Sequence, residues 1–324
     1  MNMQLGETDS RTSSSVRRAS SISPFTFATH SIAHEGHPER NEDTILVDRR
    51  RGLAAVFDGV GGEDAGDVAS QLGARVIRRT WGSIVQQQYP DHNAALLRLS
   101  DELNIEVLLH QLLDEAQSAI SDEGERRAKA VATPPEHISY PETTVVVTVL
   151  CQRPDQSPDT KGYLMGYAHV GDSRIYLLRP GEPIQRLTRD DGYFTLKIKD
   201  QTISEEDALR IDQTTHAEQL TEAECEIFDK RNGITQSLGH LNPKQTSITI
   251  HTAQTMIFPG DRVLLCSDGI HDNLMDAEIE AIVRGSARTT VARHLVQRAL
   301  ERSRETHLRA KKDDMSAVVI TCNL

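Results

Sequence analysis

The sequence has few cysteines and no long apolar run. Its four cysteines are widely separated and show no CxxC spacing: Cys151, Cys225, Cys266 and Cys322. This pattern argues against a zinc site or a disulfide framework and predicts isolated buried thiols in a reducing compartment. No apolar run approaches the roughly 18 residues that a membrane helix needs. Because no apolar signal segment is visible near the start either, we expect a cytoplasmic protein with no membrane partner.

Positive charge is also in deficit. The 324 residues include 36 Lys and Arg against 48 Asp and Glu, which gives a net charge of −12. This balance argues against nucleic acid as a partner, because binding a phosphate backbone needs clustered basic residues. Hydrophobic residues make up 37% of the chain, which is enough for a sizeable core. Since the surface is acidic and no repeats are evident, we expect a monomer.

The chain divides into a tail and a folded region. Residues 1–23 are rich in Ser and poor in large apolar side chains, so we expect a disordered tail. The string Arg17-Arg18-Ala19-Ser20 resembles a site for basic-directed kinases, but a solvated tail is the favoured interpretation. Residues 24–324 read as one domain with two inserts. Residues 152–161 predict a polar hairpin tip, and residues 189–232 predict a long irregular insert of the kind that forms a flap beside a site.

Short apolar runs rich in β-branched residues predict strands. They are Phe25–Thr29, Thr44–Val47, Leu53–Phe57, Thr143–Leu150, Tyr163–Val170, Arg174–Leu178, Ser247–Thr252, Arg262–Cys266 and Ser316–Thr321. Helical spacing predicts helices over residues 65–84, 276–284 and 288–304, and two more within 93–130. Many of the strands are close in sequence, as in hairpins, which favours antiparallel sheets in an α+β fold.

Acidic residues recur at the ends of these predicted strands. Asp58, Asp172 and Asp268 follow apolar runs, Asp313 and Asp314 precede the last run, and Glu42-Asp43 opens the strand at residue 44. A single Asp at such a place is usually a turn residue. Carboxylates clustered at several strand ends repel one another and persist only if they are protonated or neutralised by cations.

The residue types in this pattern favour hard divalent ions. Oxygen-only ligand sets suit Mg²⁺ and Mn²⁺, and no Cys or His accompanies the motifs at ligand spacing, which disfavours zinc. After Asp58, Gly59 and Gly61-Gly62 allow sharp turns and close backbone approach, so the Gly59 carbonyl could join a metal shell. The sequence therefore predicts a carboxylate-held metal centre.

Taken together and in order, the motifs resemble the protein phosphatase 2C family, the metal-dependent serine/threonine phosphatases, in its bacterial style. The resemblance covers about residues 25–324. The motifs are Arg40-Asn41-Glu42-Asp43, Asp58-Gly59-Val60-Gly61-Gly62, Glu142-Thr143-Thr144, Gly171-Asp172-Ser173-Arg174, Leu187-Thr188-Arg189-Asp190, Ser237-Leu238-Gly239, residues 261–269 and Asp313-Asp314-Met315-Ser316. The resemblance implies a four-layer αββα sandwich, in which two antiparallel sheets are flanked by helices.

The resemblance also implies roles for single residues. Two core Mg²⁺ or Mn²⁺ ions are expected, with a looser third ion. The implied metal residues are Asp58 as the bridge, the Gly59 carbonyl on one core ion, Asp268 and Asp313 on the other, Glu42 and Asp43 at the metal-water shell, and Asp172 and Asp272 with Asp268 on the third ion. The reaction implied is hydrolysis of phosphoserine and phosphothreonine in proteins by metal-activated water. A phosphorylated protein and a partner serine/threonine kinase are the implied partners in signalling.

The chain departs from the family pattern at the phosphate-binding arginine. Family members usually carry it five residues before the final Asp of the first motif, where this chain has Pro38. Arg40 and His37 are alternative sources of positive charge, and we count Arg40 with the catalytic residues Asp58, Asp268 and Asp313. Val60 stands where eukaryotic members often carry a histidine. Cys266 precedes the Ser267-Asp268 pair without a CX5R loop, so we interpret it as a core residue.

Two other functions remain open on the sequence alone. One is a phosphatase of the same fold that acts on a non-protein phosphate ester. The other is a catalytically weak pseudophosphatase that works as a regulatory binding module, which the missing arginine favours. The intact set of Asp58, Asp268 and Asp313 favours the active protein phosphatase.

Overall fold

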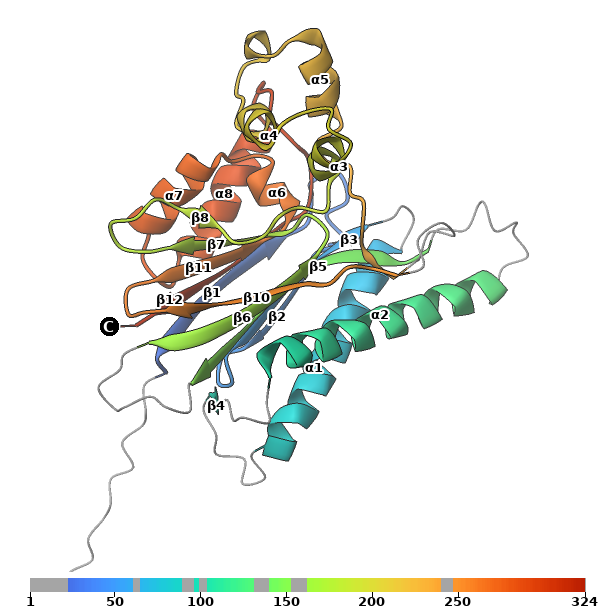
Figure 1. Cartoon of the computed structure of the whole chain (residues 1–324), viewed down its shortest axis with the longest axis vertical. Coiled ribbons are helices and arrows are strands. Elements are labelled where there is room, and N and C mark those ends of the chain that lie inside the picture. The colour runs from blue at the N-terminus through green and yellow to red at the C-terminus, as the bar shows by residue number, and fades with distance from the viewer. Residues whose placement is uncertain are drawn as a thin grey trace, which may run out of the picture.

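The computed structural model describes residues 23–60, 65–88, 96–98, 104–130, 140–152, 162–239 and 247–323. Two β-sheets lie face to face in the middle of the molecule, and helices cover both outer faces (Figure 1). Most of the predicted tail, the tip of the insert at 152–161 and the pair Gly61-Gly62 lie outside the described residues.

The first sheet has the strand order β1-β12-β11-β7-β8, and its neighbours pair in antiparallel fashion. Its strands are β1 (Phe25–Ile32), β7 (Arg174–Leu178), β8 (Gln185–Arg186), β11 (Arg262–Cys266) and β12 (Met315–Cys322). Every residue of β12 is buried, because this strand is flanked by β1 and β11 and covered on both faces. This position explains its continuous apolar run.

The second sheet has the order β10-β6-β5-β3-β2, with two short strands, β4 and β9, added to β5. Its strands are β2 (Thr44–Asp48), β3 (Leu53–Val60), β4 (Leu97–Arg98), β5 (Glu142–Gln152), β6 (Tyr163–Val170), β9 (Leu238–Gly239) and β10 (His251–Ile257). All described pairings are antiparallel except that of β4 with β5. The predicted sandwich of antiparallel sheets is confirmed.

Helices form the two outer layers, and further helices form the insert at 189–232. The helices α1 (Gly66–Gln88) and α2 (Ile105–Ala130) cover the second sheet, and α6 (Asp268–His271), α7 (Asp276–Gly285) and α8 (Val291–Ser303) cover the first (Figure 1). Between β8 and β9 the chain forms α3 (Tyr193–Lys199), α4 (Glu205–Asp212), η2 (Ala217–Gln219) and α5 (Glu222–Asp229). In Figure 1 these last elements stand above one end of the sheets.

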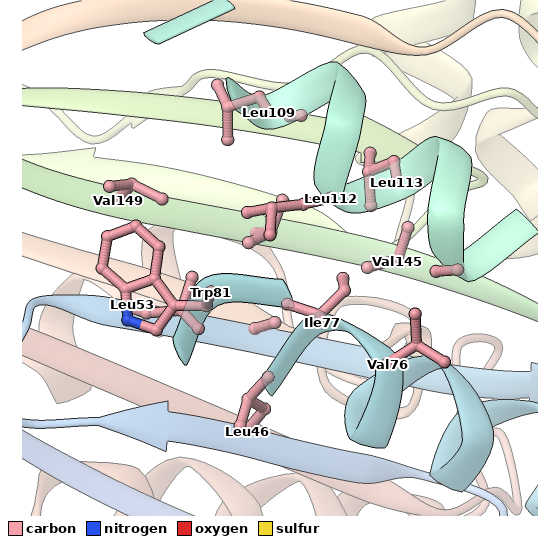
Figure 2. Close-up of a cluster of buried hydrophobic side chains, with 14 of the residues drawn as sticks. Leu46, Leu53, Val76, Ile77, Trp81, Leu109, Leu112, Leu113, Val145 and Val149 are labelled. Carbon is pink, nitrogen blue, oxygen red and sulfur yellow. The ribbon is translucent and has the colours of Figure 1, made fainter. Parts of the chain in front are cut away.

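The apolar core has three parts, and β3 shows why. Leu53, Ala55 and Phe57 face α1 and α2, while Ala54 and Val56 face the other sheet, because side chains alternate along a strand. Figure 2 shows the outer cluster, in which Trp81 and Ile77 of α1 meet Leu112 of α2 over the sheet. A third cluster lies beneath α7 and α8. Because β3 is buried on both faces, it packs against the helices on one side and against the other sheet on the other.

Several expected boundaries were wrong. The strand predicted over Ser247–Thr252 is β10, which begins at His251 and runs to Ile257. The strand predicted over Leu53–Phe57 continues to Val60, so Asp58 lies inside β3 instead of after it. Within 93–130 the described residues contain one long helix, α2.

The insert at 189–232 is mainly helical instead of irregular. Its helices α4 and α5 each begin with a capping box, Ser204 with Asp207 and Thr221 with Glu224. These side chains satisfy the first N–H groups of helices only eight residues long.

All four cysteines are free, and Cys151, Cys266 and Cys322 are buried as predicted. Cys225 lies on α5 of the helical insert and is only half-buried. Among the described residues, no helix is both long enough and apolar enough to cross a bilayer.

Candidate metal centre

Five acidic residues from separate parts of the chain meet at one end of the two sheets. Asp58 lies in β3, Asp43 precedes β2, Asp172 follows β6, Asp268 begins α6 directly after β11, and Asp313 precedes β12. The N–H of Asp268 lies 3.5 Å from Oδ2 of Asp58, which joins the two sheets at this point. The structure therefore brings together residues up to 270 positions apart in the sequence.

The electrostatics of Asp58 show how crowded this end is. Burial raises the pKa of Asp58 well above its ordinary value, and the charges of Asp268, Asp43, Asp313 and Asp172 raise it further. Burial likewise raises the pKa values of Asp43 and Asp172. Carboxyl groups in such surroundings cannot all be ionised unless positive charge is supplied between them. The cluster therefore suits divalent cations.

Unused acceptor atoms point to the same conclusion. Among the described residues, Oδ1 of Asp43, of Asp172 and of Asp268 accepts no hydrogen bond although each atom is buried. Buried oxygens without a donor are costly, and a hard cation is a ligand that satisfies them. In the described part of the chain, no three acidic or imidazole groups converge closely enough to hold an ion as they stand. The donor set fits Mg²⁺ or Mn²⁺ in its chemistry, and the carboxylates must draw together to bind.

Gly59 lies where a side chain has no room. A Cβ atom built there would collide with the backbone of Gly66 at the start of α1. The Gly59 N–H donates a 3.1 Å hydrogen bond to the carbonyl of Glu42, and the Glu42 carboxyl group packs next to Gly66. The structure thus places Glu42 beside Gly59, the residue that follows Asp58. Burial raises the pKa of Glu42, although Arg40 acts in the opposite direction.

Asp272 differs from the other carboxylates. Burial alone would raise its pKa, but Lys311 and His271 hold the pKa well below its ordinary value. Asp272 and Asp172 both line a pocket of about 530 Å³ whose opposite wall includes Phe194 and Leu209 of the helical insert. Two of the three residues expected to hold a third ion, Asp172 and Asp272, therefore line a pocket shared with the insert.

Lys311 is the main residue of the centre that the sequence patterns did not reveal. Its Nζ forms ion pairs with Asp268, with Asp272 at 3.0 Å and with Asp313 at 3.0 Å. Burial would lower the pKa of Lys311, but these three carboxylates raise it well above its ordinary value. The only signal in the sequence was its position two residues before Asp313.

The Asp314 carboxyl group binds backbone N–H groups at and before the motif Arg40–Asp43 instead of pointing to the acidic cluster. Its Oδ1 accepts a hydrogen bond from the His34 N–H, and its Oδ2 accepts one from the Glu42 N–H, both at 2.6 Å. Nearby, Arg40 Nη2 lies 3.2 Å from Oε1 of Glu42, so Arg40 is at the edge of the centre. His37 contacts Asp314, with 3.7 Å between Nδ1 and Oδ1.

Cys266 has no part in this chemistry. It is buried in the core beneath α7 and α8, and burial raises the pKa of its thiol. A thiol held protonated in this way is a poor nucleophile.

Comparison with known proteins places the whole arrangement in one family. Residues 32–311 match the family model described as Protein phosphatase 2C. The chain is 26% identical to a putative protein phosphatase 2C-type of Streptococcus pyogenes, over 75% of this chain and 78% of that protein. It is 30% identical to the serine/threonine protein phosphatase PstP of Mycobacterium tuberculosis, over 80% of this chain but only 39% of that longer protein.

A solved structure agrees with the sequence matches. The crystal structure of the catalytic domain of PstP in complex with two manganese ions superposes with a TM-score of 0.60 at 23% identity, covering 93% of this chain and 99% of that one. At this identity the likeness concerns the fold. Together with the family match, it confirms the predicted architecture and enzyme class: the chain belongs to the protein phosphatase 2C family of serine/threonine phosphatases.

Proposed function

We propose that this protein removes phosphate from phosphoserine and phosphothreonine in proteins, with water activated by divalent ions held at the Asp58 cluster. The observation that carries the proposal is the position of Asp58, buried among four other carboxylates. The proposed ions are Mn²⁺ or Mg²⁺, and the crystallised complex of the PstP catalytic domain with two manganese ions supports this choice. Such ions supply a water of low pKa and neutralise the phosphoryl oxygens.

The proposed roles of the residues are those that the family resemblance implies. Asp58 would hold both core ions, the Gly59 carbonyl would help to hold one of them, and Asp268 with Asp313 would help to hold the other. Glu42 and Asp43 orient water at the shell: Asp43 is fixed by the Ser267 hydroxyl at 2.7 Å, and Glu42 by the hydrogen bond of its N–H to Asp314. Asp172 and Asp272 hold a third ion with Asp268. Arg40, beside Glu42, contacts the substrate phosphate in place of the arginine that Pro38 replaces.

We also propose that the helical insert at 189–232 contacts the substrate. The pocket between the insert and Asp172 opens beside the metal cluster, and Leu209 in its wall is 55% exposed. An exposed apolar side chain at that place is suited to the residues that flank a phosphorylated serine. Replacing Leu209 by Ala should then raise KM for phosphopeptides more than for p-nitrophenyl phosphate, which is too small to reach it.

The proposal also covers the substrates, the partner, the oligomeric state and the compartment of the enzyme. Phosphorylated proteins are the substrates, a serine/threonine kinase is the functional partner, and the enzyme is a cytoplasmic monomer. The four free cysteines support a reducing compartment. The domain spans residues 24–324, after the tail at 1–23.

The test is an assay on a phosphothreonine peptide. Wild-type protein is measured with Mn²⁺ and with EDTA, and Asp58→Asn is measured with Mn²⁺. Asp122→Asn, which changes an exposed carboxylate on α2, is the matched control. We expect activity only with metal, a loss of at least about 100-fold in Asp58→Asn, and no change in the control. Tight Mn²⁺ binding without turnover of peptides or small esters would instead favour the regulatory module.

A further inference from the structure

The carboxylates assigned to the metal ions already hold a cation that belongs to the chain. Nζ of Lys311 contacts Asp268, Asp272 and Asp313 together. These three residues come from different proposed ion positions, since Asp268 and Asp313 share a core ion while Asp268 and Asp272 share the third. The ammonium group therefore contacts carboxylates assigned to both of these proposed ion positions.

The backbone of Lys311 is fixed at this place. The side chain of Asn273, which is fully buried, accepts a hydrogen bond from the Lys311 N–H at 3.0 Å and donates one to the Lys311 carbonyl at 2.9 Å. The same Asn273 amide donates to the Gly269 carbonyl in the turn that carries Asp268. Asn273 thus ties the Lys311 backbone to α6, the helix that begins with Asp268.

The Lys311 side chain is partly exposed to solvent. The Lys311 side chain is 17% exposed and the Asp313 carboxyl group is 34% exposed, so the ammonium group approaches from the solvent side. The lysine side chain is a flexible four-carbon stem, so its charge can move while the backbone stays in place. A divalent ion and an ammonium group on the same carboxylate oxygens would repel each other strongly.

We propose that Lys311 is a resident counter-cation of this centre, which neutralises Asp268, Asp272 and Asp313 in the metal-free protein and must swing out before an ion binds to Asp268 and Asp313. This inference rests on the proposed metal-dependent function and adds a competitor to it. The lysine lowers the apparent affinity for the ion at that position, and it stabilises the fold when no ion is present.

The experiment compares Lys311→Gln with Lys312→Gln, which removes the same charge from the exposed neighbouring residue. Binding of Mn²⁺ is followed by the electron paramagnetic resonance signal of the free ion, and thermal unfolding is measured in EDTA. For Lys311→Gln we expect at least about tenfold tighter binding of one Mn²⁺ ion. We also expect its melting temperature in EDTA to fall by about 5 °C or more, because the buried Asp268 and Asp272 and the partly exposed Asp313 lose a shared partner. Lys312→Gln should match wild type in both.

The outcomes separate this inference from the proposed function. If wild type binds Mn²⁺ and hydrolyses the peptide while Lys311→Gln binds Mn²⁺ no more tightly, the lysine does not compete and only the inference is wrong. Weaker binding by Lys311→Gln would also overturn it, because the lysine would then be holding the ligands in place. If neither wild type nor Lys311→Gln binds Mn²⁺, both proposals are wrong.

Discussion

The Ser267 hydroxyl donates a 2.7 Å hydrogen bond to Oδ2 of Asp43, a residue 224 positions earlier in the chain. The same Ser267 oxygen accepts the N–H of Ser316 at 3.0 Å. The buried Ser267 hydroxyl therefore connects the residue before β2 in one sheet to the end of β11 and the beginning of β12 in the other. The position of the Asp43 carboxyl group depends on this connection.

We expect Ser267→Ala to lower the free energy of unfolding in EDTA by about 1–3 kcal/mol, because a buried carboxyl group and a buried N–H lose their partner. Affinity for Mn²⁺ should fall by about tenfold, as is usual when a group that orients a ligand is removed. Urea unfolding and calorimetric titration measure the two effects. Ser83→Ala, on the exposed side of α1, should stay within about 0.5 kcal/mol of wild type. A stable Ser267→Ala protein would show that the hydroxyl is dispensable.

Asp314 should matter through its two acceptor oxygens and not through its charge. Replacement by Ala strands the N–H groups of His34 and Glu42 and should destabilise the protein by about 1–3 kcal/mol. Replacement by Asn keeps one acceptor oxygen, so a smaller loss is expected. Chemical denaturation of the two variants side by side measures the difference. Equal losses in Asp314→Asn and Asp314→Ala would contradict this role.

Gly59 should tolerate no side chain. The atoms that a Cβ would meet belong to the Gly66 backbone, which cannot rotate away, so Gly59→Ala should cost about 1–3 kcal/mol of stability and reduce metal binding. Gly82 in α1 is a control in the same layer, since a Cβ there meets nothing within 4 Å. Gly82→Ala should raise stability by about 0.5–1 kcal/mol, because it removes helix-disfavouring flexibility. Thermal and urea unfolding of both variants test the contrast.

His169 should make the protein sensitive to mild acid. Burial lowers its pKa to about 4; Asp191 opposes this shift, stacked His251 adds to it and Asp190 opposes it. An unfolded chain takes up a proton near pH 6.5, so between about pH 6.5 and 4 the unfolded state binds more protons and stability falls as pH falls.

The loss from this residue should reach about 3 kcal/mol across that window. His169→Gln should therefore flatten the dependence of unfolding free energy on pH, whereas the exposed His216→Gln should leave it unchanged. Urea unfolding at pH 7, 6 and 5 makes the comparison. An unaltered slope in His169→Gln would mean that other groups carry the acid sensitivity.

Arg40 should act on substrate binding more than on turnover. Arg40→Gln removes the positive charge beside Glu42 and should raise KM for a phosphothreonine peptide by about tenfold or more with kcat nearly unchanged. Pro38→Arg, which restores the usual family residue at an exposed position, should lower KM. The exposed Arg126→Gln on α2 is the control. A large fall in kcat in Arg40→Gln would place this residue in the chemical step instead.

The sequence by itself predicted most strands and helices and the acidic residues at strand ends, and the resemblance to the family added the four layers. Continuous apolar runs such as Val145–Leu150 mark strands buried on both faces, and hydrophobicity reports burial directly. The sequence did not show where weaker strands lie. Only one of the seven residues of β10 is buried, because this strand lies at the edge of its sheet, so its apolar pattern is faint and its start was misplaced. The extension of β3 through Asp58 and Gly59 depends on pairing with Thr144 and Thr143, which no local pattern records.

Only the tertiary structure decided what neutralises the carboxylates. The recurrence of acidic residues at predicted strand ends suggested a carboxylate cluster, and the resemblance to the family implied that Asp58, Asp268 and Asp313 share the core ions. It did not predict that Lys311 enters the same cluster or that Asp314 turns away to hold Glu42. Asp314 and Glu42 lie 272 positions apart and Lys311 and Asp268 lie 43 apart, so these contacts depend on the packing of the fold and not on local sequence.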